Sequence, residues 1–181
     1  YERIFVSIIA ALISLGRKPR CTLEIPEGGQ GRLKRIHTLI ESCRVSLHDL
    51  SHIKTPVRFN MPFELGLACA LDRHNGPHTY ILFEKQRYRL DKTLSDIKGR
   101  DPYIHKGTMR GAVQCIFDAL GREGGQPELP KVYKMAVDLW QVAKEIKRVN
   151  EIKSIFKRTA YSELIAAAVK YATNRGFIPK N

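Results

Sequence analysis

Cysteine is scarce in this sequence and never occurs in closely spaced pairs. The four cysteines, at positions 21, 43, 69 and 115, are far apart, and no CxxC spacing is present. This argues against a zinc site, and we expect neither a metal nor a cofactor. Each cysteine lies in an apolar stretch, which is typical of reduced core thiols in a cytoplasmic protein. A catalytic thiol is the alternative, for which Cys21 is best placed.

Long hydrophobic runs are also absent. The apolar stretch Ile4–Leu15 is interrupted by Ser7 and Ser14 and is too short to span a bilayer. It also lacks the basic segment that precedes a secretion signal. We therefore expect a soluble, cytoplasmic protein without a membrane partner. With 43% hydrophobic residues among 181, the chain can bury the core of an ordinary domain.

Acidic residues are too few to balance the basic ones. The chain carries 31 Lys and Arg against 18 Asp and Glu, a formal net charge of +13. Such an excess favours partners that carry phosphate, although a solvated helical face is the alternative. We rank nucleic acid last, because no zinc-finger, RNP or helix-turn-helix signature accompanies the charge. Its candidate donors would be Lys144, Lys147, Arg148, Lys153, Lys157 and Arg158.

Helical and strand-like patterns alternate along the first 121 residues. We expect helices at 2–15, 32–43, 60–72, 90–97 and 109–120. We expect strands at 18–26, 44–50 and 78–84, and an edge strand at 101–105. This alternation predicts an α/β fold with an open parallel sheet and right-handed crossovers.

The last third of the chain has a different pattern. A Gly- and Pro-rich linker at 122–130 precedes two further helical patterns, at 132–149 and 160–173. We therefore expect an α/β domain over residues 1–121. The linker and a C-terminal helical segment packed on that domain would occupy 122–181.

One carboxylate stands out inside the apolar stretch 59–71. Glu64 is its only charged residue, and Asn60 is a good helix N-cap with Pro62 in the following turn. A carboxylate in a first helical turn is stabilised by free N–H groups, which is one explanation. The other is a functional carboxylate, because Asp49 and Glu24 end expected strands and open parallel sheets bind ligands at that edge.

The sequence resembles the nucleoside 2-deoxyribosyltransferases over most of residues 1–120. The resemblance rests on "HDLS" at 48–51 followed by "RFNMPFELGLA" at 58–68, with further motifs at 19–24, 32–51 and 95–105. Those transferases carry an Asp after a strand and a nucleophilic Glu in the next helix. The NAD-cleaving TIR domains of the same superfamily carry a Glu early in the equivalent helix. The match is closest to a set of bacterial proteins of this superfamily.

The resemblance implies a fold, a reaction and a set of site residues. The fold would be a flavodoxin-like or TIR-like three-layer α/β/α arrangement with extra C-terminal helices. The reaction would cleave or exchange the N-glycosidic bond of a nucleoside, a nucleotide or NAD. Glu64 corresponds to the nucleophile, Asp49 to the acid that contacts the sugar, and Asn60 to a substrate contact. The same motifs carry four further candidate pocket residues: Ser51, His48, Arg58 and Arg32.

Two alternatives stay open. Members of the superfamily begin with a strand that would precede Tyr1, and its loss would leave a sheet edge that a second copy could cover. A non-catalytic nucleotide-binding or TIR-like assembly module is then the alternative to an enzyme. For single residues, His48 can be a buried strand-end imidazole, and Arg58 and Arg32 can be surface cations.

Overall fold

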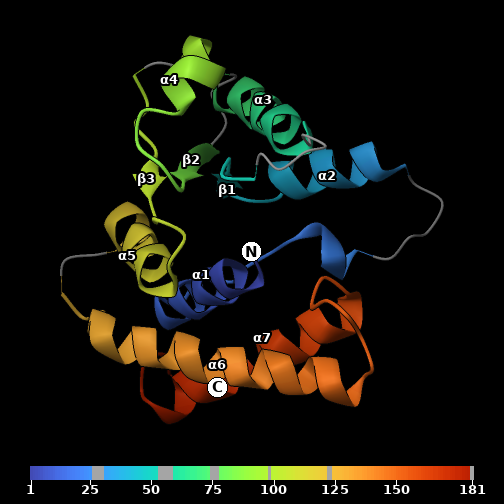
Figure 1. The fold of residues 1–181 in the computed structure, drawn as a ribbon, viewed down its shortest axis with the longest axis vertical. Helices are drawn as coiled ribbons and strands as arrows, with labels where there is room; N and C mark the ends of the chain where they lie inside the picture. The colour runs from blue at the N-terminus through green and yellow to red at the C-terminus, as the bar shows by residue number, and fades with distance from the viewer. Residues whose placement is uncertain (26–30, 53–58, 74–77, 98, 122–123, 180–181) are drawn as a thin grey trace. The chain divides into compact units, whose positions relative to one another are not determined.

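Three parallel strands form a small open sheet in the computed structural model, which describes residues 1–25, 31–52, 59–73, 78–97, 99–121 and 124–179 (Figure 1). Strand β1 is Val45–Asp49, β2 is Thr79–Glu84 and β3 is Tyr103–Ile104. Their order is β1-β2-β3, with both neighbouring pairs parallel. The mixed α/β class, the open parallel sheet and the expected strands at 44–50, 78–84 and 101–105 are confirmed.

The chain divides into two compact units, and the strands belong to only one of them. Unit 2 is Glu27–Lys106, and unit 1 combines Tyr1–Pro26 with Gly107–Asn181. Unit 1 contains residues on both sides of the expected domain boundary between residues 121 and 122. That boundary stays a prediction. None of the described helices combines the length and the apolar character needed to cross a bilayer.

Unit 2 covers one face of its sheet with helices. These are α2 (Arg32–Glu41), α3 (Asn60–Arg73), the short α4 (Leu90–Thr93) and a 3-10 turn at Ser95–Ile97. Leucines from a strand end, a strand and two helices form the core: Leu50, Leu82, Leu65 and Leu90. A second cluster, Ile36, Ile40 and Ala68, joins α2 to α3, which lie side by side in Figure 1. Burial of these side chains is the main term that holds α3 against β1 and β2.

Unit 1 is a helical assembly around the N-terminal helix. Helix α1 (Glu2–Ser14) packs against α5 (Met109–Leu120), α6 (Leu129–Val149) and α7 (Arg158–Asn174). Most of α1 is buried, which explains its nearly continuous apolar sequence. At its start, Glu2 accepts hydrogen bonds from Lys147 Nζ and from the Ile155 backbone N–H, both at 2.9 Å.

The expected strand at 18–26 is wrong in the described part of that segment. Residues Thr22–Glu24 form a 3-10 turn, in which the Glu24 N–H donates to the Cys21 carbonyl at 3.1 Å. The Tyr161 hydroxyl on α7 donates to the Pro19 carbonyl at 2.9 Å. These bonds satisfy the backbone without a neighbouring strand, which an alternation pattern alone does not reveal.

Candidate functional site

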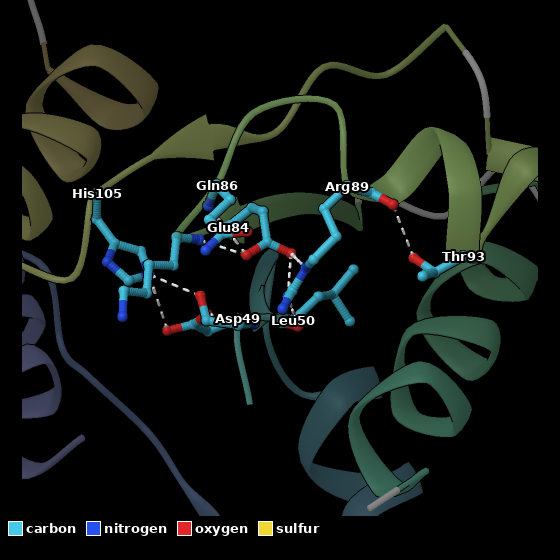
Figure 2. A network of polar contacts seen from close by, with 9 residues as sticks. Asp49, Leu50, Glu84, Gln86, Arg89, Thr93 and His105 are labelled. Carbon is cyan, nitrogen blue, oxygen red and sulfur yellow. Dashed lines mark hydrogen bonds and ion pairs between the residues drawn. The ribbon is translucent and has the colours of Figure 1, made fainter. Parts of the chain in front are cut away.

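Two polar networks follow the carboxyl ends of the three strands (Figure 2). The first joins Asp49, the last residue of β1, to Ser51 and to His105, which directly follows β3. The Ser51 N–H donates to Asp49 Oδ1 at 2.9 Å, and the Ser51 hydroxyl donates to the same oxygen. His105 Nε2 lies 2.8 Å from Ser51 Oγ and 3.4 Å from Asp49 Oδ2.

The contacts of this first network determine the ionisation of Asp49 and the direction of each hydrogen bond. Burial alone would raise the pKa of Asp49, but the contact with the His105 imidazole and the hydrogen bonds from Ser51 outweigh it and lower the pKa below its ordinary value. The Ser51 hydroxyl proton points at Asp49, so Ser51 Oγ accepts from His105 Nε2–H. Asp49 is thus held as an ionised acceptor, and Ser51 lacks the arrangement of an activated nucleophile, whose proton would go to the imidazole.

The second network centres on Glu84, whose side chain is fully buried at 0% exposure. Glu84 Oε1 accepts the backbone N–H groups of Lys85 and of Gln86, the latter at 3.2 Å. Glu84 Oε2 accepts from the guanidinium of Arg89 through Nε at 2.9 Å and through Nη2, and Nη2 also donates to the Leu50 carbonyl. We call Glu84, Arg89 and the Leu50 carbonyl the Glu84 clamp. Neither Glu84 nor Arg89 is among the predicted site residues, although a carboxylate that ends an apolar strand is a signal for such a pair.

Strand register determines which site residues share a face of the sheet. His48 pairs with Leu82 and Asp49 pairs with Phe83, and in-register partners face the same side. Leu82 packs with Leu65 of α3, so α3 covers the face that carries His48. Asp49 therefore projects from the opposite face, and its carboxylate and that of Glu64 belong to different sides of the sheet.

Glu64 lies deeper in α3 than expected. The helix begins at Asn60, and the Phe59 carbonyl accepts the Phe63 N–H at 3.0 Å. Phe59 is therefore the N-cap, which corrects the expectation that Asn60 holds that position. The first turn contains no acidic residue, so helix-end stabilisation does not account for Glu64.

The Glu64 carboxylate is half-buried and unpaired. Within the described residues, no hydrogen bond or ion pair involves it. Burial raises the pKa of Glu64, and the positive charge of Arg32 opposes this only in part. A carboxylate in this setting ionises at higher pH than usual, which is a property of functional acids as well as of strained surface groups.

The other predicted site residues are scattered. Asn60 and Arg32 are exposed at the first positions of α3 and α2. Arg58 lies outside the described residues. Cys21 is half-buried and burial raises its pKa, which makes its thiol a poor nucleophile at neutral pH. No group of three or more metal-ligating side chains occurs in the part of the chain that the structure describes.

His48 belongs to a third network, away from Asp49. Ser46 Oγ lies 2.8 Å from His48 Nε2 and 3.0 Å from His78 Nε2, and His78 Nδ1 lies 2.7 Å from the Cys43 carbonyl. A carbonyl only accepts, so His78 carries its proton on Nδ1 and its Nε2 accepts the Ser46 hydroxyl. Ser46 Oγ then accepts from His48 Nε2–H. This order leaves His48 Nδ1 as a buried acceptor without a partner among the described residues.

We expect His48 to make the fold sensitive to acid. Burial, and then the charge of His78, lowers the pKa of His48 to about 4 from 6.5. Because the unfolded chain binds this proton first, stability falls as the pH drops from about 6.5 to about 4, by up to about 3 kcal/mol. His48→Gln keeps a donor near Ser46 but does not titrate. Urea unfolding at several pH values should show that this variant loses most of that slope.

The control for this prediction is His52→Gln, at an exposed histidine of the same unit. It should keep the pH slope of the native chain. Equal slopes for His48→Gln and the native chain would show that another group unfolds the protein in acid.

Comparisons with known proteins add no family to this geometry. The chain matches no family model, no curated protein and no solved structure. The resemblance to deoxyribosyltransferases and TIR domains stays a prediction.

Proposed function

We propose that this chain is an enzyme that cleaves or exchanges the N-glycosidic bond of a nucleoside, a nucleotide or NAD, with Glu64 as the nucleophile. The observation that carries the proposal is the half-buried carboxylate of Glu64 on α3, which has a raised pKa and no hydrogen bond or ion pair to any residue that the structure describes. A purely structural carboxylate in such a position would be expected to have a hydrogen-bonded or charged partner.

The chemistry follows from the position of a partly desolvated carboxylate. Glu64 would attack the anomeric carbon as the base leaves, or stabilise the oxocarbenium ion that forms there. Water would then release the sugar, or a second base would take it up. Asp49, held ionised by Ser51 and His105, would supply a fixed negative charge near the strand ends.

The remaining site residues are proposed as substrate contacts. Exposed Asn60 and Arg32 would reach a ligand near the start of α3, and Arg58, outside the described residues, stays a predicted substrate contact. We also propose the finer fold, a flavodoxin-like or TIR-like three-layer domain. The parallel order β1-β2-β3 with helices on the His48 face is consistent with two of its three layers.

A non-catalytic nucleotide-binding module is the second candidate. One observation favours it: Asp49 projects from one face of the sheet, whereas Glu64 lies on α3, which covers the opposite face, and a shared catalytic centre needs both carboxylates on one side. In such a module the ligand would stabilise the fold without being changed.

One experiment separates the two candidates. The chain is incubated with NAD, 2′-deoxyadenosine and AMP, free base is quantified by chromatography, and thermal unfolding is followed with each ligand. Release of a base supports the enzyme. A rise of the unfolding temperature without release supports the binding module. If neither occurs with any of the three, both candidates fail for these ligands.

A further inference from the structure

The loop after β2 holds an exposed aromatic side chain in a strained backbone conformation. Tyr88 has a φ of 60°, in the left-handed region that side chains other than glycine avoid, and its side chain is 73% exposed. A bulky residue in that region is unfavourable and persists only where the surrounding structure imposes it. The ring gains nothing from burial that would offset the strain.

The Glu84 clamp imposes this conformation. At the start of the loop, the buried Glu84 carboxylate accepts hydrogen bonds from the backbone N–H groups of Lys85 and Gln86. At the end of the loop it holds Arg89, which is also tied to the carbonyl of Leu50. Thr93 Oγ1 in turn donates to the Arg89 carbonyl at 3.1 Å (Figure 2). Both ends of residues 85–89 are therefore fixed to the carboxyl edge of the sheet, and Tyr88 projects from a rigid base.

The same loop presents unpaired positive charge. Lys85 and Arg87 are exposed, and neither makes an ion pair with any residue that the structure describes. The loop directly follows the carboxyl end of β2, the central strand, which is where open parallel sheets bind ligands. An exposed aromatic ring can stack on a planar base, and two cations on the same loop can neutralise a phosphate.

We propose that residues 85–89 bind a phosphorylated nucleoside. Its base would stack on the ring of Tyr88, and its phosphate would contact Lys85 and Arg87. The inference rests on the proposed function and narrows its substrate class to nucleotides, with unphosphorylated nucleosides as weaker ligands. The strain at Tyr88 is then the consequence of holding the ring in a fixed binding position.

Isothermal titration of the full chain carrying Glu64→Gln, which prevents turnover, tests this with AMP, adenosine and ribose 5-phosphate. AMP should bind most tightly. Tyr88→Ala should lower the affinity for AMP and for adenosine about tenfold or more, because stacking is lost, and should leave the affinity for ribose 5-phosphate unchanged. Arg87→Gln should lower the affinity for AMP and for ribose 5-phosphate by about tenfold and should leave the affinity for adenosine unchanged.

Matched variants separate binding from folding. Tyr1→Ala and Lys92→Gln remove an exposed ring and an exposed cation elsewhere and should leave all three affinities unchanged. Tyr88→Gly also removes the ring but relieves the strained φ. It should therefore bind as weakly as Tyr88→Ala while its unfolding temperature rises by about 2–4 °C.

The outcomes distinguish this inference from the proposed function. If AMP does not bind, or if Tyr88→Ala and Arg87→Gln bind AMP as tightly as the chain with Glu64→Gln alone, the loop is not the site. If the chain with Glu64 intact releases base from AMP equally fast with and without Tyr88→Ala, the inference fails and the enzyme stands. If binding depends on Tyr88 and Arg87 but no base is ever released, the inference stands and the glycosidic chemistry fails.

Discussion

Replacing Arg89 with Met should lower the free energy of unfolding by about 3–5 kcal/mol. The methionine removes the guanidinium that binds Glu84 Oε2 and the Leu50 carbonyl, while Glu84 stays at 0% exposure. A buried carboxylate that has lost its cation either stays charged, with nothing to compensate for its lost hydration, or takes up a proton. Urea unfolding at neutral pH, followed by circular dichroism, measures the loss.

A double variant isolates the cause of this loss. Glu84→Gln combined with Arg89→Met removes the buried charge together with its partner, so it should be more stable than Arg89→Met alone. Arg148→Met breaks an exposed ion pair with Glu145 and should change stability little. A loss for Arg89→Met no larger than for Arg148→Met would show that the clamp does not hold the strand ends.

Much of the fold was predictable from local pattern. The strand β2 was readable because four consecutive apolar residues suit a strand covered on both faces, and its last three residues are buried. Helices α5, α6 and α7 were readable because their buried residues recur at helical spacing. These elements need no knowledge of distant contacts.

The errors arose at contacts that residue spacing does not specify. Residues 22–24 form a turn that the Glu24 N–H closes on the Cys21 carbonyl, and Tyr161, far along the chain, donates to the nearby Pro19 carbonyl. The N-cap of α3 is Phe59 rather than Asn60, because the Phe59 carbonyl accepts the Phe63 N–H. Sequence spacing alone contains neither fact.

The candidate site was predictable in its residue types but not in its partners. Strand alternation could have separated His48 from Asp49, since neighbours on a strand face opposite sides. The pairing of Asp49 with His105, and of Glu84 with Arg89, depends on strand order, which the sequence analysis did not predict. The loop that carries Tyr88 was missed for the same reason.

The second large effect is expected from Glu64→Gln, which should slow release of base by about a thousandfold or more if Glu64 is the nucleophile. Glutamine keeps the size of the side chain but cannot attack the anomeric carbon. Because burial raises the pKa of Glu64, activity of the native chain should rise with pH up to a higher value than for an ordinary carboxylate. Chromatographic assay of free base over a pH series measures both.

The stability of the Glu64→Gln variant should not fall with its activity. A carboxyl whose pKa is raised by folding binds its proton more tightly in the native state, so the native chain loses stability as pH rises from the unfolded toward the folded pKa. Glu64→Gln removes this cost and should be at least as stable as the native chain at neutral pH. Glu41→Gln, on the exposed part of α2, is the control and should leave activity unchanged. If Glu64→Gln instead lowers stability and leaves base release intact, Glu64 is a structural residue and its carboxylate has no part in the reaction.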